Sequence, residues 1–226
     1  MHNFNFSPEI LHRFPGICVM AGTIEGVVIK EGSPSLEDFK KDVIANIKSM
    51  YVLENVKNDP GFRAYRDFFW SVGVDPTKTR PASEALVRRI LSGGKLPVIN
   101  TAVDSYNLAS AISGVPIAAF DADRIEGDLN MRFASGGESF KGIGMKEPVT
   151  LKPEQVILTD RNKIVAIYPY RDSDDTKVTP STKNMLIVSC GVPGIDVAKV
   201  KEAYQTCVEY LAEYAGGDPV SPAMYP

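Results

Sequence analysis

Residues 96–121 read LPVINTAVDSYNLASAISGVPIAAFD, and this stretch carries the signals of a helix followed by a strand. Thr101, with Asp104 three residues later, predicts a helix start, because a hydroxyl can cap the first turn and the helix dipole favours an acid there. Gly114 predicts the end of this helix, since glycine adopts the left-handed conformation without a Cβ clash. The short apolar run 115–120 then predicts a buried strand.

A stripe of polar residues runs along the expected helix. Asn100, Asp104 and Asn107 recur at spacings of four and three residues and therefore share a face with Ser110. Burying amides and a carboxylate without hydrogen-bond partners is costly. We therefore expect the stripe either to form a hydrogen-bond network that belongs to the fold or to face a functional site.

Composition excludes several classes of protein. The apolar share of 44% is that of a globular protein and excludes disorder as the main state. No apolar run approaches the ~18–20 residues that span a bilayer, and the N-terminal residues lack the basic and apolar segments of a secretory signal. The net charge of −3 provides no global basic field for nucleic acid, so an RNA contact requires a local patch.

The cysteines and histidines argue against a metal centre. Cys18, Cys190 and Cys207 are widely spaced without a CxxC motif, which favours a reducing cytoplasm and no zinc site. His2 and His12 both lie near the N-terminus, which argues against a histidine-based triad or a His-rich metal site. We expect Cys190 and Cys207 to be core residues, since no histidine is nearby to activate a thiol.

Helical signals dominate before Gly114 and strand signals after it. Apolar residues at three- and four-residue spacing predict helices after Ser35, from 62 to 72 with Trp70 in the core, from 83 to 91, and from Asp196 onward. Strands are expected at 17–20, 23–29, 128–133, 155–159, 163–168 and 185–190, and the tail 217–226 is expected to be loose. With no repeat and no long linker, residues 1–226 are expected to form a single α+β domain.

Three polar clusters are candidates for chemistry. They are Thr77, Lys78, Thr79 and Arg80 in a loop; Asn100, Asp104 and Asn107; and Arg171, Asp172, Ser173, Thr176, Thr179 and Thr182. The third cluster is typical of a solvated hairpin tip, or alternatively of a cradle for a phosphodiester, a ribose and an amine, since arginine forks bind phosphate oxygens in pairs. Arg132 is expected either to join such a site or to pair with Glu138.

Three segments carry a family resemblance: NTAVDSYNLASAISGVPIAAFD (100–121), EGDLNMRFASGGESF (126–140) and TKNMLIVS (182–189). Together they resemble the B3/B4 domain of the phenylalanyl-tRNA synthetase β subunit, with the order of the motifs kept over residues 80–190. The resemblance implies a layered α/β fold of the α+β class, with a mixed sheet of unusual topology flanked by helices. It implies a B3/B4-like core at about 72–192, with strand and helix elements at 15–71 and a C-terminal helix at 196–214 packed on it.

The resemblance also carries expectations about function. The synthetase's other modules do not fit in 226 residues, so it implies a free-standing B3/B4 protein without aminoacylation activity. In the synthetase this domain hydrolyses tyrosine that is wrongly esterified to the phenylalanine tRNA. The histidine and the glutamate of the family's editing site fall at Ala118 and Val188 here, so a different polar set is expected to line the same cavity.

The leading functional hypothesis is a cytoplasmic, trans-acting hydrolase that removes a mischarged or non-protein amino acid from aminoacyl-tRNA. Its partner would be a tRNA 3′ end or an aminoacyl-adenosine-like ligand, with no membrane, metal or cofactor, because the ester is already activated and needs only a held water and donors for the oxyanion. The alternatives are a non-catalytic module that binds tRNA, another RNA or an amino-acid-like small molecule, and a purely structural polar network. The oligomeric state is left open.

Candidate roles follow from this hypothesis. The catalytic candidates, which would bind the amine or activate water, are Asp104, Asp172 and Glu138. The substrate-binding candidates are Arg80, Thr79, Asn100, Asn107, Arg132, Arg171, Ser173, Thr176 and Thr182. Of these, the two arginines Arg80 and Arg171 are expected to contact phosphate or ribose.

Overall fold

The structure, a computed structural model, describes residues 2–226. Its α-helices are α1 (Pro8–Arg13), α2 (Pro34–Met50), α3 (Pro60–Ser71), α4 (Ala82–Leu91), α5 (Thr101–Ser113) and α6 (Val197–Ala215). Its strands are β1 (Phe4–Phe6), β2 (Cys18–Glu25), β3 (Ile117–Asp121), β4 (Leu129–Phe133), β5 (Ser139–Phe140), β6 (Val149–Thr150), β7 (Val156–Thr159), β8 (Ile164–Ile167), β9 (Arg171–Asp172), β10 (Asn184–Gly191) and β11 (Asp218–Tyr225). Short 3-10 helices are η1 (Val56–Asn58), η2 (Ala122–Arg124) and η3 (Asp174–Thr176).

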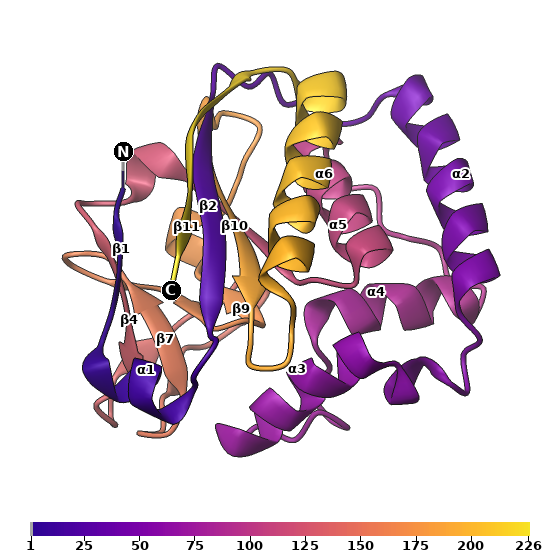
Figure 1. Ribbon diagram of the computed structural model, residues 1–226. Coiled ribbons are helices and arrows are strands. Elements are labelled where there is room, and N and C mark those ends of the chain that lie inside the picture. Colours follow the sequence, from indigo (N-terminus) through magenta and orange to yellow (C-terminus); the bar gives the residue numbers. More distant parts are fainter. Residues whose placement is uncertain (1) are drawn as a thin grey trace.

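The elements form layers, as Figure 1 shows. A four-stranded sheet with the order β11-β2-β10-β3 lies between α6 on one side and the strands β4 and β7 on the other. The latter belong to a five-stranded sheet with the order β1-β4-β7-β8-β9. That sheet is mixed, because β1 pairs with β4 in parallel whereas β4, β7, β8 and β9 pair antiparallel. The predicted α+β class with a mixed sheet is therefore confirmed.

The strand β10 organises the four-stranded sheet, because it pairs antiparallel with both β2 and β3. Its pairing with β2 is unbroken from Cys18 to Glu25, so the expectation of two separate strands around Ala21 and Gly22 is wrong. Gly22 faces α6, since a Cβ added there would meet the hydroxyl of Tyr204. Successive residues of a strand point to opposite faces, so its neighbour Ala21 faces the five-stranded sheet.

The C-terminal tail is an edge strand, not a loose segment as expected. β11 pairs antiparallel with β2, from Asp218 opposite Glu25 to Tyr225 opposite Val19. The ring of Tyr225 also packs 5.2 Å from that of Phe4, centroid to centroid. Proline is tolerated at such an edge, where an amide is not needed for a further strand. The pairing partner lies at the other end of the chain, and the local pattern of the tail gives no sign of it.

The quoted stretch folds as the expected helix and strand, with the cap moved by one residue. Asn100 caps α5, and its side-chain oxygen accepts a hydrogen bond from the amide of Val103 at 2.9 Å. Thr101 instead ties the helix start to Lys30, whose amide donates to the threonine hydroxyl at 3.1 Å. Gly114 ends α5 with a φ of 71°, in the left-handed conformation that favours glycine.

The helix α3 presents Trp70 to solvent. This side chain is 54% exposed, so the expectation that it is a core residue is wrong. Phe62, Tyr65 and Phe69 are buried at spacings of three and four residues and occupy the inner face of the helix. A residue that directly follows Phe69 is rotated by about 100° around the helix axis and leaves that face.

Two larger clusters make up the apolar core. The main cluster joins the inward faces of both sheets to α3 and α6, and a second cluster joins α2, α4 and α5. Cys190 and Cys207 are buried in the main cluster, as expected for core residues. Within residues 2–226, no helix has the length and apolar character needed to cross a bilayer.

Candidate functional site

The polar stripe of α5 begins with a buried ion pair. The carboxylate of Asp104 lies 2.7 Å from the ammonium of Lys40 on α2, and both side chains are buried. The second carboxylate oxygen accepts a hydrogen bond from the amide of Ile99 at 3.1 Å. Burial alone would lower the pKa of Lys40, but the hydrogen bonds and charges of Asp104 and Glu37 outweigh it and raise this pKa. Asp104 thus holds both α2 and the loop that precedes α5 against the first turn of α5.

The other members of the stripe also contact the fold. Asn100 is the buried cap of α5, and Asn107 lies beside Asp104 along a small void of about 10 Å³. Ser110 donates a hydrogen bond to the carbonyl of Val115 at 2.9 Å, just after the helix end. These contacts favour the structural interpretation of the stripe, in which it is a hydrogen-bond network.

Arg132 and Glu138 form a bidentate ion pair. Two guanidinium nitrogens of Arg132 lie 2.7 and 3.1 Å from the two carboxylate oxygens of Glu138. Glu138 also accepts a hydrogen bond from the amide of Ser135 at 2.6 Å. The hydrogen bond from Arg132 lowers the pKa of Glu138, so the carboxylate stays ionised at neutral pH. The pair closes the turn that follows β4. Of the two roles expected for Arg132, joining a site or pairing with Glu138, the structure shows the pairing.

A polar cavity brings together Glu138 and Ser173, two of the candidate residues. It has a volume of about 350 Å³ and is also lined by Asn162 and the two lysines Lys141 and Lys163. Ser173 is buried there and accepts a hydrogen bond from the amide of Asp175 at 3.2 Å, which caps η3. The cavity therefore combines hydroxyl, amide and ammonium donors with the carboxylates of Glu138 and Asp175.

The threonine-rich run is packed along β3, and it is not a solvated hairpin tip. Thr182 donates a hydrogen bond to the buried carboxylate of Asp121 at 2.7 Å and accepts one from the amide of Thr179 at 3.0 Å. Phe120 of β3 forms an isolated bridge with Lys177. Thr176 is fully buried, and its hydroxyl has no hydrogen-bond partner within residues 2–226. The run thus covers the outer edge of β3.

Asp172 is the candidate residue with the most perturbed ionisation. Burial raises the pKa of this carboxyl to about 7, although the backbone amide of Ala119 and the charge of Arg171 act in the opposite direction. No side-chain hydrogen bond or ion pair holds the carboxylate within residues 2–226. A buried ionisable group that titrates near neutral pH is a candidate for acid–base chemistry.

Two further residues lie in the surroundings of Asp172. Burial raises the pKa of Tyr106, and the negative charge of Asp172 raises it further, so the phenol stays protonated at neutral pH. The same two causes raise the pKa of Cys190, which therefore remains a thiol and is a poor nucleophile. Tyr106 was not among the candidates. It lies within the quoted stretch, but its spacing alone does not distinguish a core tyrosine from a site tyrosine.

Ala118 and Val188 occupy the positions that the resemblance assigns to the editing histidine and glutamate. They are direct partners on β3 and β10, and Val188 also pairs with Ala21 on β2, so these side chains face the five-stranded sheet. Val188 is buried and Ala118 is half-buried. The place where the resemblance expects two ionisable groups is thus filled by apolar side chains.

The arginines do not converge on one cavity. Arg80 is exposed in the loop before α4 and forms no ion pair within residues 2–226, while neighbouring Thr79 is half-buried. Arg171 donates a hydrogen bond to the carbonyl of Ile143 at 3.2 Å, whereas Asp104 is bound to Lys40. No group of three or more His, Cys, Asp or Glu side chains in the described part of the chain has an arrangement that could hold a metal ion.

Comparisons with known proteins agree with the fold. The model of the B3/4 domain family matches residues 64–216. Phenylalanine–tRNA ligase β subunits of Corynebacterium jeikeium and Corynebacterium glutamicum are 29% and 28% identical over 145 and 152 residues, which cover 64% and 67% of this chain and 16% and 18% of those proteins. The chain therefore spans about a sixth of the length of these curated relatives.

A solved structure has the same fold. It is an N-terminal fragment of the phenylalanyl-tRNA synthetase β subunit from Pyrococcus horikoshii, which is similar with a TM-score of 0.54 and 18% sequence identity. The similarity covers 99% of this chain and 54% of that one. At this identity the likeness concerns the fold alone, and the chemistry must be argued from the residues of this chain.

Proposed function

We propose that this chain, which belongs to the B3/4 domain family, hydrolyses the ester bond between an amino acid and the 3′ end of a tRNA. The names of the relatives, which are phenylalanine–tRNA ligase β subunits, support a substrate related to tRNA. The observation that carries the proposal is the carboxyl of Asp172, which lies beside Tyr106 and the amide of Ala119 and has a pKa near 7. Ala119 directly follows Ala118 on the edge strand β3.

Asp172 is the proposed general base. A carboxylate with a pKa near the working pH is deprotonated often enough to accept a proton and is still basic enough to take it from water. The activated water attacks the ester carbonyl carbon, and the bond between that carbon and the ribose oxygen then breaks. The ribose oxygen takes the proton from Asp172, so the products are a free amino acid and an uncharged tRNA. This step needs neither a nucleophilic side chain nor a redox partner.

Tyr106 is the proposed donor for the negative charge that develops on the carbonyl oxygen. Its phenol stays protonated because burial and the charge of Asp172 raise its pKa. A donor that is already in place where charge develops stabilises the transition state without reorganisation. Ser173, which follows Asp172, lines the cavity that holds Lys141 and Lys163, and these ammonium groups suit a phosphate of the acceptor end.

A panel of mischarged tRNAs tests the proposal directly. We expect release of the amino acid from at least one of them, and a loss of at least about 100-fold in rate for Asp172→Asn, as for removal of a general base. Asp174→Asn is the matched control, because Asp174 lies two residues away in the same loop and pairs with Lys177. The proposal fails if no tRNA is deacylated while a known deacylase works in the same assay, or if Asp172→Asn retains the full rate.

One observation favours a second candidate function, which is a module that binds tRNA, another RNA or an amino-acid-like molecule without hydrolysing it. The apolar pair Ala118 and Val188 removes ionisable groups from the positions at which the resemblance places them. This alternative expects Arg80→Ala to weaken RNA binding, since Arg80 is exposed and free to contact phosphate, while no tRNA of the panel is ever turned over.

A further inference from the structure

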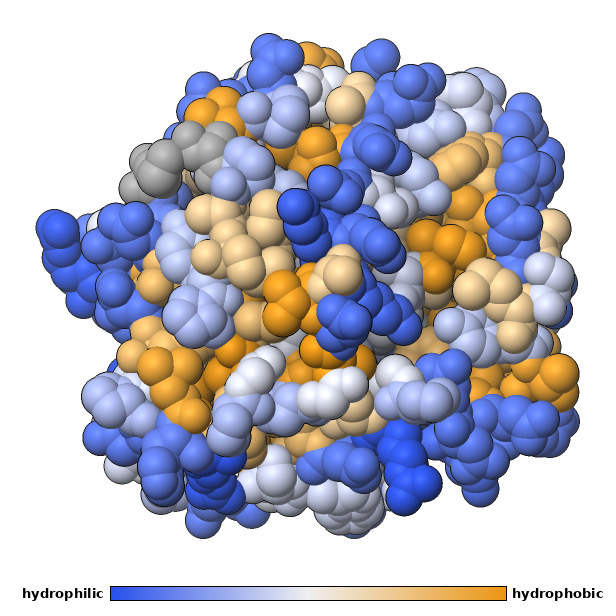
Figure 2. Space-filling model, viewed as in Figure 1, coloured by the Kyte–Doolittle hydropathy of each residue, from blue (hydrophilic) through white to orange (hydrophobic). Residues whose placement is uncertain are grey.

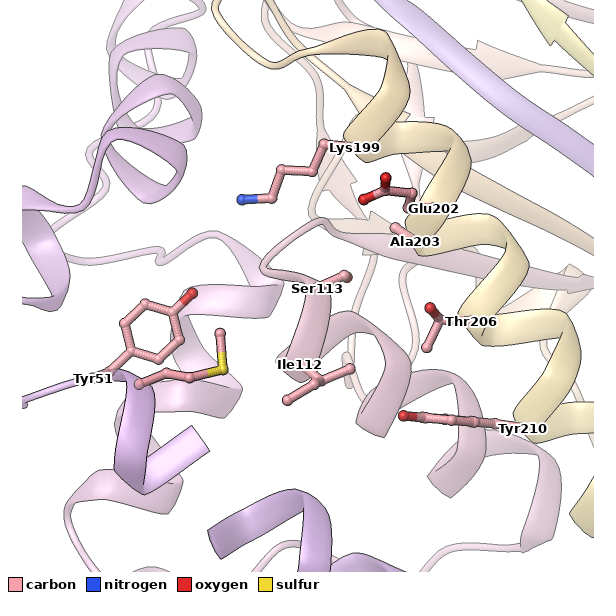
Figure 3. Close-up of a pocket in the computed structure, with 9 residues that line it drawn as sticks. Tyr51, Ile112, Ser113, Lys199, Glu202, Ala203, Thr206 and Tyr210 are labelled. Carbon is pink, nitrogen blue, oxygen red and sulfur yellow. The ribbon is translucent and has the colours of Figure 1, made fainter. Parts of the chain in front are cut away.

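A second cavity lies among the helices, and Asp172 is not one of its lining residues. It has a volume of about 360 Å³ and is bounded by the C-terminal ends of α2 and α5 and by α6. Figure 3 shows its lining residues, none of which belongs to the site proposed for ester hydrolysis. A cavity of this size lies at the lower end of the range of small-ligand pockets, which is about 300–1,000 Å³.

Two side chains of opposite charge line this cavity from α6. Lys199 and Glu202 both come from α6 and are three residues apart, so they share a face of the helix with their Cβ atoms about 5–6 Å apart. Neither side chain forms a hydrogen bond or an ion pair within residues 2–226. In Figure 3, Lys199 extends away from α6 toward the side on which Tyr51 lies, while Glu202 stays close to the helix. The ammonium of Lys199 and the carboxylate of Glu202 are therefore both available to a ligand.

The ammonium of Lys199 lies between the ends of two helices. It is 3.8 Å from a Cβ built at Gly114, the residue that ends α5, and 3.1 Å from one built at Gly61, in the first turn of α3. The C-terminal end of a helix carries a partial negative charge, which favours a cation. The end of α5 thus favours the ammonium, and its donors, which form no hydrogen bond within residues 2–226, are available to an anionic group of a ligand.

The rest of the cavity wall is largely apolar. Met50 is 56% exposed at the end of α2, and Ile112 and Tyr210 line the cavity from α5 and α6. Figure 2 shows hydrophobic residues gathered on the surface between α6 and α2. An exposed apolar wall beside a pair of opposite charges suits a molecule that has a zwitterionic head and an apolar body.

We propose that this cavity binds a free α-amino acid with an apolar side chain. Lys199 binds its carboxylate, Glu202 binds its ammonium group, and the side chain packs against Met50 and Ile112. Charge-assisted hydrogen bonds of this kind are the strong ones in proteins. The site is independent of the proposed hydrolysis, because it shares no residue with the surroundings of Asp172.

Calorimetric titration with leucine, methionine and phenylalanine tests this proposal. We expect at least one of them to bind, and Lys199→Ala and Glu202→Gln each to weaken the binding by at least about tenfold, as for loss of a hydrogen bond to a charged group. Two analogues separate the charges: 4-methylpentanoate lacks the amine of leucine, and 3-methylbutylamine lacks its carboxylate. Both are expected to bind more weakly than leucine, also by at least about tenfold.

The matched controls are Lys201→Ala and Glu209→Gln, which change exposed residues of α6 that do not line the cavity. Both are expected to leave the Kd unchanged, and so is Asp172→Asn, whether or not the chain hydrolyses tRNA esters. The proposal is overturned if none of the three amino acids binds at millimolar concentration, if either analogue binds as tightly as leucine, or if a control weakens binding as much as Lys199→Ala does.

Discussion

Ala118 of β3 and Val188 of β10 lie directly opposite each other on neighbouring antiparallel strands. Side chains at directly opposite positions have Cβ atoms about 4.5–5.5 Å apart and therefore act as one pair. The two positions that the resemblance assigns to editing residues are thus adjacent in this fold, and both are apolar here. The carboxyl of Asp172, on β9, lies close to the amide of the next residue of β3, Ala119, and the proposed chemistry depends on its charge, its basicity and its effect on Tyr106.

The raised pKa of Asp172 makes stability depend on pH. The carboxyl titrates near its ordinary value of 3.8 when the chain is unfolded and near 7 when it is folded. Between these values the folded protein binds a proton that the unfolded chain does not, so stability is lost as the pH rises through 7. We expect the wild-type protein to lose about 4 kcal/mol relative to Asp172→Asn between pH 4 and pH 8.

Urea unfolding of both proteins across this pH range measures the difference. Asp174→Asn is the control with the opposite sign, because the hydrogen bond from Lys177 lowers the pKa of Asp174. That contribution is present above the unfolded pKa and is lost as the pH falls through the folded one. A difference between wild type and Asp172→Asn that stays constant from pH 4 to pH 8 would show that the carboxyl is not perturbed.

The buried pair of Lys40 and Asp104 should be essential for stability. Lys40→Ala leaves the carboxylate of Asp104 buried without its cation, which we expect to cost about 3–5 kcal/mol of unfolding free energy. Lys41→Ala, which breaks the exposed pair with Asp38, should leave the unfolding free energy nearly unchanged, because solvent screens this pair. Denaturant unfolding compares the two variants directly. Equal losses would contradict the structural role of the buried pair.

Asp104→Asn separates stability from ligand binding. This change keeps the shape of the side chain but removes the charge that Lys40 requires, so we expect a lower Tm. If the polar stripe of α5 is only a network of the fold, the same variant should bind tRNA with an unchanged Kd under conditions where it remains folded. Weaker tRNA binding by the folded variant would instead return Asp104 to the functional site.

Gly22 should be intolerant of a side chain because of Tyr204. A Cβ at this position would overlap the tyrosine hydroxyl and lie 3.0 Å from the Cα of Pro222, so Gly22→Ala should cost about 1–3 kcal/mol. Tyr204→Phe removes a buried hydroxyl that has no partner within residues 2–226 and should be close to neutral. The double variant should recover part of the loss. A double-mutant cycle by thermal unfolding that shows no coupling would contradict this packing.

Removal of β11 should expose the edge of β2. A chain that ends at Gly217 lacks the strand that pairs with β2 and the ring of Tyr225 that packs on Phe4. We expect a loss of about 2 kcal/mol or more, which corresponds to a fall in Tm of about 4–8 °C, and concentration-dependent association through the open edge. Tyr225→Ala, which keeps the strand, should lower the Tm by less and stay dispersed in size-exclusion chromatography. Equal behaviour of the two variants would refute the role of the strand.

Local sequence signals were sufficient to predict the helices and the fold class. The spacing of apolar residues located α2, α3, α4 and α6, because a helix is built from contacts three and four residues apart that the sequence displays directly, and the signals of a helix start and a helix end located α5. Gly114 marked the end of α5 correctly, since the left-handed conformation is a property of one residue. The three quoted motifs gave the family, which the comparison over residues 64–216 bears out.

Only the tertiary structure decided the partners of these elements. The tail became β11 because β2 offers an open edge, and Trp70 is exposed because α3 turns another face to the core. Asp104 pairs with Lys40 from a different helix, and the pKa of Asp172 is raised because folding buries its carboxyl. Pairing, burial and ionisation depend on groups that are distant in the chain, so they are set by how the elements pack and not by the local sequence.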